Sequence, residues 1–222
     1  MNKALFCVLA SLTTPALAQP PSPAIANAPV INNAPVIDNE RVTVRDIRLE
    51  PGTPGPAVEH AGDYVVLYLQ GGRIRSADGK TVTHPTGGAM FGHGGTTSDT
   101  AANSPAHEVV MELKDAPSKT VPNTTGLPPA FPRAGSKKVL ENEKVRVWNY
   151  AWQMGKPTPM HFHNTEVVVV YRGDGDIAST TPDGKTATNH HNPGDIVFNV
   201  ANRSHSEELV KGQQSGIMLE LK

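Results

Sequence analysis

The chain has 222 residues, and its 20 lysines and arginines nearly balance its 21 aspartates and glutamates, which gives a formal net charge of −1. It carries neither the basic stripe of a nucleic-acid-binding protein nor the amphipathic helix of a membrane-surface protein, so we expect a small-molecule partner. Its 20 glycines and 20 prolines, between short valine-rich runs, predict an all-β fold with many turns.

Residues 1–18 have the features of a secretory signal peptide. The basic start MNK precedes the apolar run ALFCVLASL, and TTPALA ends in an A-x-A pattern before Gln19. The run is shorter than the roughly 20 residues that a membrane-spanning helix needs. We therefore expect cleavage after Ala18, a periplasmic or secreted protein, and no stable membrane insertion after cleavage. Cleavage removes the only cysteine, Cys7, and leaves 222 − 18 = 204 residues without disulfides.

Residues 19–38 form a Pro-rich leader that contains NAPVIN followed by NAPVID. This short repeat is expected to run extended, either as a flexible leader or as an added edge strand. Beyond it, residues 39–114 resemble residues 139–222 in four collinear segments, at offsets of 103, 102, 105 and 108 residues. The matched segments are NERVTVRDI and NEKVRVWNY, YVVLYLQGGRI and EVVVVYRGDGDI, ADGKTVT and PDGKTAT, and VVMELK and IMLELK. This order indicates a tandem duplication.

Residues 115–138 form a Pro-rich linker between the two units. The linker carries five prolines and is long enough to pack against a domain surface. In the following unit, the alternation in KVRVWNYAW predicts a strand with Val145 and Val147 on one face. Trp148, Tyr150 and Trp152 share the other face, where such a stripe is typical of a packed core. The apolar run EVVVVYR predicts a strand buried on both faces, and short strands at this spacing favour a sandwich or a small barrel.

The segment MHFHNTE contains the chemistry-bearing residues of the second unit. In a strand, His161 and His163 point to the same face, about 6.6 Å apart along the chain. Two imidazoles at this spacing can bind one ion at metal–nitrogen distances of about 2.1 Å. Glu166 can add an oxygen, and His205, which follows the predicted strand DIVFNV, is the candidate for a third nitrogen. The alternative is that these residues are rim histidines bonded to backbone, a solvent-facing carboxylate and a loop histidine.

These residues resemble the first motif of the cupin superfamily, G-x5-H-x-H-x3-4-E-x6-G. Gly155, His161, His163, Glu166 and Gly173 follow it, with two residues instead of three or four between His163 and the glutamate.

The second cupin motif, G-x5-P-x-G-x2-H-x3-N, matches more loosely. Gly194 and His205 stand at the right separation, but Val200, Asn202 and Leu209 replace the usual proline, glycine and asparagine.

The resemblance implies a bicupin: two tandem cupin-type β-barrels (double-stranded β-helix or jelly roll), with a degenerate domain at 39–114 and a metal-binding domain at 139–222. The offsets place the metal-binding positions of the second unit on residues that do not form a ligand set in the first. The correspondences are His161 on Glu59, His163 on Ala61, Glu166 on Tyr64 and His205 on about Asp99, with Glu59, His60, His84 and His93 as polar residues nearby.

A site of three histidines and a carboxylate suits one divalent transition metal: Fe, Mn, Zn, Ni or Cu. The sequence predicts an exported, metal-dependent enzyme of the oxygenase type that acts on a small organic substrate, with Glu166 as the one possible catalytic residue. The alternatives are a non-catalytic module that binds a small molecule or a metal, and a metal-free structural bicupin. His190 and His191 are expected at the surface, and both a monomer and a homodimer are compatible with the sequence.

Overall fold

The computed structural model describes residues 33–222, so the expected signal peptide and residues 19–32 of the leader lie outside the described residues. Every helix or strand assigned in the described part is a β-strand, which confirms the all-β prediction. Within that part there is no helix of the length and apolarity needed to cross a membrane. Residues 33–222 all belong to one compact unit.

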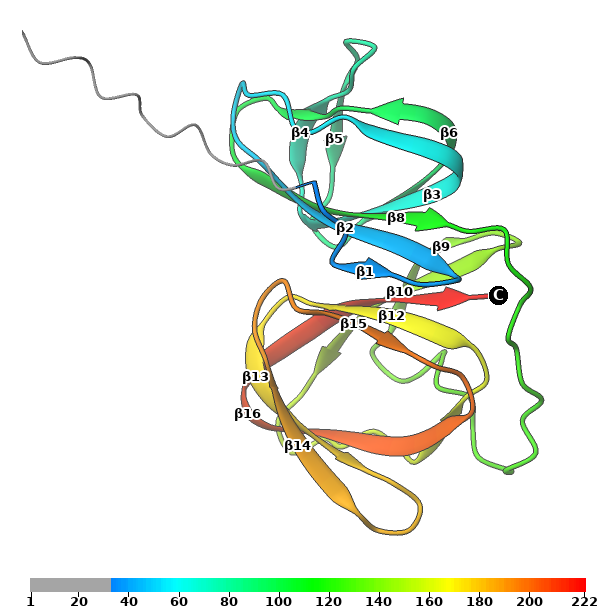
Figure 1. Ribbon diagram of the computed structural model, residues 1–222. Coiled ribbons are helices and arrows are strands. Elements are labelled where there is room, and N and C mark those ends of the chain that lie inside the picture. Colours follow the sequence, from blue (N-terminus) through cyan, green and yellow to red (C-terminus); the bar gives the residue numbers. More distant parts are fainter. Residues whose placement is uncertain (1–32) are drawn as a thin grey trace, which may run out of the picture. The chain divides into compact units, whose positions relative to one another are not determined.

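The N-terminal half consists of two antiparallel sheets (Figure 1). One sheet has five strands in the order β1-β2-β8-β3-β6, and the other has three strands in the order β5-β4-β7. The short β1 pairs with β2 at the sheet edge, so the end of the predicted leader is an added edge strand. The bounds are β1 Ile37–Asp38, β2 Val42–Leu49, β3 Val58–Gln70, β4 Gly72–Arg75, β5 Thr81–His84, β6 Ala89–Thr97, β7 Thr100–Ala101 and β8 Ala106–Leu113.

The C-terminal half is one eight-stranded antiparallel sheet whose strands close around an interior (Figure 1). Its last strand, β16, has 19 residues and pairs with four others: with β11 and β13 along its first part, and with β10 and β12 along its second. The bounds are β9 Lys137–Glu141, β10 Val145–Trp152, β11 His161–His163, β12 Glu166–Tyr171, β13 Asp174–Thr180, β14 Thr186–His191, β15 Ile196–Asn199 and β16 Arg203–Leu221.

Three apolar clusters account for the packing, because alternate residues of a strand face opposite sides. One cluster fills each interior, and a third joins the two halves. In β12, Val168 and Val170 belong to the joining cluster, whereas Val167, Val169 and Tyr171 face the C-terminal interior. The prediction that the valine run is buried on both faces is therefore confirmed.

The registers of the two halves show the duplication in three dimensions. Val65 pairs with Met111 in the first half, and Val168 pairs with Leu219 in the second, which corresponds to offsets of 103 and 108 residues. Both pairs belong to the joining cluster. The offset of 102 that matched Glu166 to Tyr64 is one residue too small, because Tyr64 faces an interior and Val65 does not. The true counterpart of Glu166 is Asp63.

This correspondence relates two ion pairs between the halves. Arg41 Nε lies 2.9 Å from Glu166 Oε2, and Lys144 Nζ lies 2.6 Å from Asp63 Oδ2. Arg41 and Lys144 are themselves equivalent in the duplication, at an offset of 103. Each half thus supplies one cation to the carboxylate of the other.

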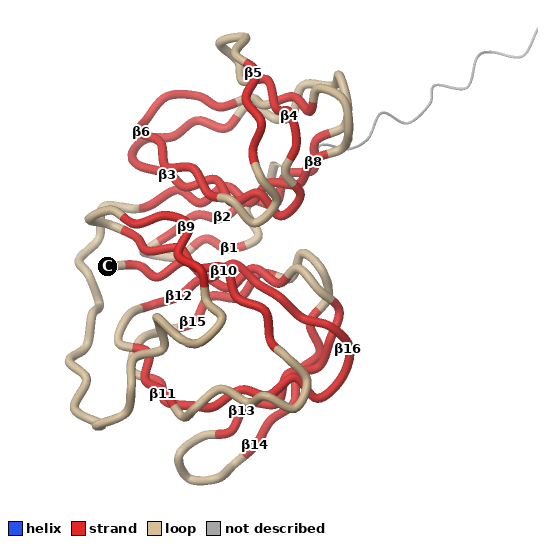
Figure 2. Tube along the Cα trace, turned by 180° about the vertical axis from the view of Figure 1, so that it is seen from behind, coloured by secondary structure: helices blue, strands red, loops and turns tan. Residues whose placement is uncertain are grey.

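The Pro-rich linker is part of the C-terminal half (Figure 2). Ala130 and Phe131 are buried in its apolar interior cluster, and the Phe131 ring stacks on Trp148 with a centroid distance of 5.3 Å. The Ala130 amide donates to the Phe162 carbonyl over 3.0 Å, next to a bridge between Pro129 and Phe162. The linker therefore packs against a domain surface, as its length suggested, and brings its own side chains to the interior.

Candidate metal centre

Two neighbouring antiparallel strands bring the three predicted histidines together. β11 carries His161 and His163 on one face, the backbone of Phe162 between them bonds to the linker, and β16 places His205 directly opposite His161. The same register places Arg203 opposite His163. Because His205 is two residues after Arg203, both side chains leave β16 on the side of the histidine pair.

The three imidazoles converge through their Nε2 atoms. The Nε2 of His163 lies 3.2 Å from that of His161 and 3.1 Å from that of His205. Two nitrogens that are each about 2.1 Å from a common ion are separated by about 3.0 Å at a 90° angle and by about 3.4 Å at a tetrahedral angle. The observed separations fall between these values, so the cluster has the geometry to hold a metal ion.

A hydrogen bond orients the first histidine for this role. His161 Nδ1 lies 2.8 Å from the Pro159 carbonyl, and a carbonyl oxygen only accepts hydrogen bonds. Nδ1 therefore carries the ring proton, and Nε2 presents its lone pair to the other two histidines. Fixing the tautomer from the outer side is a common feature of histidine metal ligands.

Burial keeps the three imidazoles neutral. Loss of hydration lowers the pKa of His161 and of His163 below their ordinary value, and Arg203 lowers that of His163 further. Burial also lowers the pKa of His205, to about 4, although Glu207 opposes the shift. A neutral imidazole is the form that binds a metal ion. All three ligands are thus ready at neutral pH without a proton having to leave.

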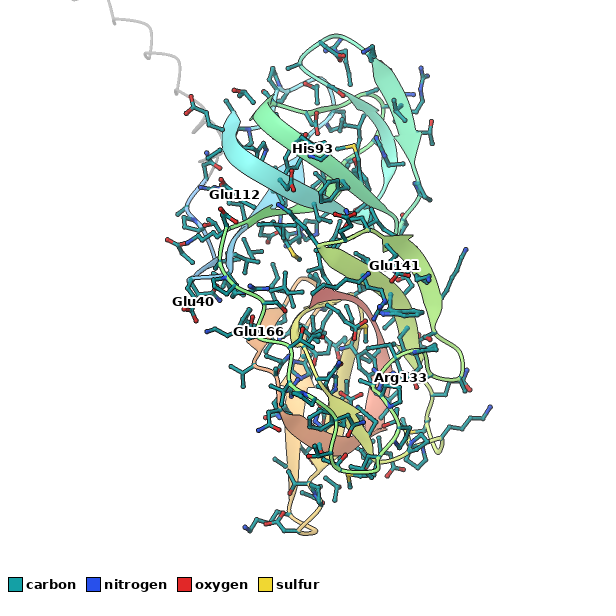
Figure 3. All side chains as sticks on the ribbon, turned by 90° about the vertical axis from the view of Figure 1, so that its right-hand side faces the viewer. Glu40, His93, Glu112, Arg133, Glu141 and Glu166 are labelled. Atoms are coloured by element: carbon teal, nitrogen blue, oxygen red, sulfur yellow. The ribbon has the colours of Figure 1, made fainter. Side chains whose placement is uncertain are left out.

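Glu166 does not lie with the histidines. Its carboxylate is buried with Arg41 between the two halves. In Figure 3, the labelled side chains of Glu166 and of the linker residue Arg133 lie at separate positions. Glu166 shares the face of Val168 and Val170, which point away from the interior. The two-residue link between His163 and Glu166 causes this orientation, because a change of one residue in the length of the link moves a strand side chain to the opposite face. The structure therefore corrects the expectation that Glu166 is a metal ligand or catalytic residue.

A different carboxylate, that of Glu207, lies beside the histidines. It lies two residues beyond His205 on the same face of β16, with Oε1 3.7 Å from His205 Nε2. Its other oxygen, Oε2, accepts hydrogen bonds from Arg133 Nη1 over 2.8 Å and from Trp152 Nε1 over 3.1 Å. The H-x-E spacing of 205–207 follows the same i, i+2 rule that drew attention to His161 and His163, so the signal was present in the sequence.

The linker residue Arg133 holds this carboxylate in its charged form. Its guanidinium group lies 4.1 Å from the Tyr150 ring centroid and 4.5 Å from that of Phe131, so aromatic rings fix its position. Burial raises the pKa of the Glu207 carboxyl, whereas the charge and the hydrogen bond of Arg133 lower it, and the pKa lies below its ordinary value. Glu207 is therefore an anion beside the cluster.

His163 and His205 of the cluster form part of the wall of a cavity of about 160 Å³ inside the C-terminal half. Its wall includes the apolar residues Val167, Val169 and Met218 and the charged groups Arg133, Arg203 and Glu207. His191 also lines it and stacks on Tyr171 at 3.8 Å between centroids, so the expectation of a surface role for His191 was wrong. His190 is exposed, as expected, and pairs with Asp176.

Two glycines of the cupin-like motif have backbone roles. Gly155 adopts a positive φ of 70°, a conformation that side chains disfavour. A Cβ on Gly173 would lie 2.2 Å from the Gln213 carbonyl oxygen, so only glycine allows β16 to pass this close.

The N-terminal half lacks an equivalent cluster among the described residues, where the three histidines above form the one group with metal-binding geometry. His60 stacks on Tyr64 and His84 on Tyr68, and His93 pairs with Asp63. Aromatic stacking thus occupies His60 and His84, and an ion pair occupies His93.

No family model and no curated protein matches this chain. Solved structures do match. A cupin 2 conserved barrel domain protein from Leptotrichia buccalis aligns with a TM-score of 0.53 and 14% identity, over 85% of this chain and 87% of that chain. An oxalate decarboxylase from Bacillus subtilis aligns with a TM-score of 0.55 and 13% identity, over 82% of this chain and 69% of that chain. The chain therefore has the fold of the cupin superfamily.

Proposed function

We propose that the C-terminal half binds one divalent transition metal through His161, His163 and His205, and that the protein is a metal-dependent enzyme acting on a small organic molecule. The convergence of three neutral Nε2 atoms, 3.1 and 3.2 Å apart, carries this proposal. The absence of cysteine from the site favours a catalytic over a structural metal. Such an ion, when bound, activates dioxygen or water or polarises a substrate oxygen.

Glu207 distinguishes an enzyme from a simple metal binder. Its Oε1 faces His205, while its Oε2 is held by Arg133 and Trp152. This geometry suits a fourth ligand, and it suits equally a base that takes a proton from a substrate beside the cluster. A charged, fixed carboxylate next to three ligands favours an active site over a storage site.

The structural neighbours are consistent with this proposal. The oxalate decarboxylase of Bacillus subtilis is described with Mn(II) centres, which places manganese among the candidate metals for this fold. Fe, Mn, Zn, Ni and Cu all suit imidazole and carboxylate ligands, and an oxygenase-type reaction is the one we favour. We further propose that the protein is exported, on the basis of its signal-like N-terminus.

Metal analysis tests the binding proposal directly. The full chain without a histidine tag is loaded with Mn(II), Fe(II), Co(II) or Zn(II), dialysed, and assayed for bound metal. We expect one equivalent in the wild type, less than about a tenth in His161→Ala and His205→Ala, and no change in His190→Ala, an exposed control. A wild type that binds less than a tenth of an equivalent of each metal contradicts the proposal.

The variant Glu207→Gln separates catalysis from binding. If Glu207 acts as a base, the variant keeps its metal and loses turnover; if it is a ligand, metal affinity falls as well. A non-catalytic binding module is the second candidate function, and the fixed small cavity supports it. Unchanged turnover in metal-loaded Glu207→Gln would remove Glu207 from the chemistry.

A further inference from the structure

The charged groups that line the C-terminal cavity do not balance. They are the cations Arg133 and Arg203 and the anion Glu207. Arg133 is paired with Glu207, with 2.8 Å between Nη1 and Oε2. One positive charge, that of Arg203, therefore remains in a cavity whose histidines are neutral, and a divalent metal would make the interior more positive still.

Arg203 is held with its terminal nitrogens free. Its Nε donates to the Val200 carbonyl over 2.9 Å, which is the only hydrogen bond of the Arg203 side chain among residues 33–222. The preceding residue, Asn202, has a positive φ of 64° and donates its amide to the His163 carbonyl over 2.9 Å. These two contacts anchor the start of β16 beside the metal-site strand. Nη1 and Nη2 form the planar fork that binds a carboxylate through two hydrogen bonds.

The cavity is small, and the uncharged part of its wall is mixed. Val167, Val169, Ile177 and Met218 form a hydrocarbon side, Ser179, Asn189 and Asn199 add polar side chains, and the volume is about 160 Å³. A cavity of about 150 Å³ elsewhere is known to hold one benzene molecule. The occupant is thus of about that size, with one charged end and a hydrocarbon part that packs on the apolar side.

We propose that this cavity binds a small organic carboxylate, with its carboxylate group on Arg203 and its apolar body against Val167, Val169 and Met218. The inference rests on the proposed function, because it names the substrate class of the same site. Arg203 lies opposite His163 in the sheet, so the bound carboxylate sits beside the three histidines and orients the molecule toward them.

Calorimetric titration with two probes of nearly equal shape tests the inference. Benzoate carries the carboxylate, and benzamide replaces it with a neutral amide. We expect benzoate to bind the wild type at least about tenfold more tightly than benzamide, because a charge-assisted hydrogen bond is the stronger kind. Arg203→Gln should lose this preference, whereas Lys211→Gln, which removes an exposed charge from the same strand, should keep it.

The titration is run on both metal-free and metal-loaded full chain. Selective benzoate binding that depends on Arg203 in the metal-free protein supports the inference even if the metal proposal fails. Arg203→Lys, which keeps the charge without the fork, should bind benzoate with intermediate affinity and shows that the fold is intact. Equal binding of benzamide and benzoate, or undiminished benzoate binding in Arg203→Gln, would overturn the inference.

Discussion

The two halves of this protein are built from the same strand plan around interiors of different chemistry. Both contribute equivalent valines and leucines to the cluster that joins them. Each half also contributes one cation and one carboxylate to the two ion pairs between the halves. The C-terminal interior holds three histidines and Glu207, whereas the N-terminal one holds Tyr64, Tyr68 and Glu108. The apolar residues that join the halves and the residues that carry the chemistry therefore lie on opposite faces of the same strands. The chemistry-bearing residues can thus be lost from one half while its joining face is retained.

The largest expected effect comes from the joining face. Glu166→Ala leaves the Arg41 guanidinium, 6% exposed in its side chain, without its counter-ion. Removing one partner of a buried ion pair costs about 3–5 kcal/mol in the free energy of unfolding. Denaturant unfolding measures the loss, and metal content should stay at one equivalent in Glu166→Gln. Loss of metal in Glu166→Gln with an intact fold would restore Glu166 as a ligand.

The second effect belongs to the N-terminal interior. Burial raises the pKa of Glu108 to about 8, and Asp99 adds to the rise. Between its ordinary pKa of about 4.5 and about 8, the folded protein keeps a proton that the unfolded chain releases. The stability contributed by this group is therefore full below about pH 4.5 and is lost as the pH rises through about 8.

Glu108→Gln should remove this alkaline decline, because a neutral amide takes the place of the protonated acid. Unfolding free energies at pH 5, 7 and 9 measure it, with Glu112→Gln on the same strand as the control. An identical pH dependence in wild type and Glu108→Gln would show that Glu108 is ionised in the folded protein.

A smaller effect, on metal affinity, is expected in the C-terminal interior. Trp152→Phe removes the indole donor to Glu207, whereas Trp148→Phe on the same strand removes a donor to Glu220 instead. Loss of an outer partner of a metal site costs about tenfold or more in metal affinity. Competition titration with a chelator should therefore show weaker metal binding for Trp152→Phe alone. Equal affinities of the two variants would place Glu207 outside the site.

The smallest effect concerns the second ion pair between the halves. Lys144, with 55% of its side chain exposed, faces Asp63, and exposed pairs contribute about 0–1 kcal/mol. Asp63→Asn should therefore change the free energy of unfolding by less than about 1 kcal/mol. A loss as large as that of Glu166→Ala would show that burial does not separate the two pairs.

Local pattern was enough to predict the strands, the duplication and the three histidines. His161 and His163 share a face by the two-residue period, and His205 follows an apolar strand that ends near them. The face of Glu166 could not be taken from a motif, because a link one residue shorter reverses it. The two-residue strand period places Glu166 on the face of Val168 and Val170. Because the valine run is apolar on both faces, only the structure shows that this face points away from the interior.

The remaining parts of the site depend on long-range packing. Arg133 reaches Glu207 from a linker that has no strand period, so no local rule places it in the interior. Arg203 stands beside His163 only because β11 and β16 pair in that register. Glu207 was accessible to sequence reasoning through its H-x-E spacing, but its pairing with Arg133 and Trp152 was not.

The number of metal ions bound per chain tests the central claim most directly. Elemental analysis of the metal-loaded, untagged protein should give one equivalent, which is lost in His163→Ala and retained in His60→Ala and His84→Ala. Two equivalents, or one equivalent that survives His163→Ala and disappears with His60→Ala or His84→Ala, would contradict the division between a metal-binding half and a half that keeps only the scaffold.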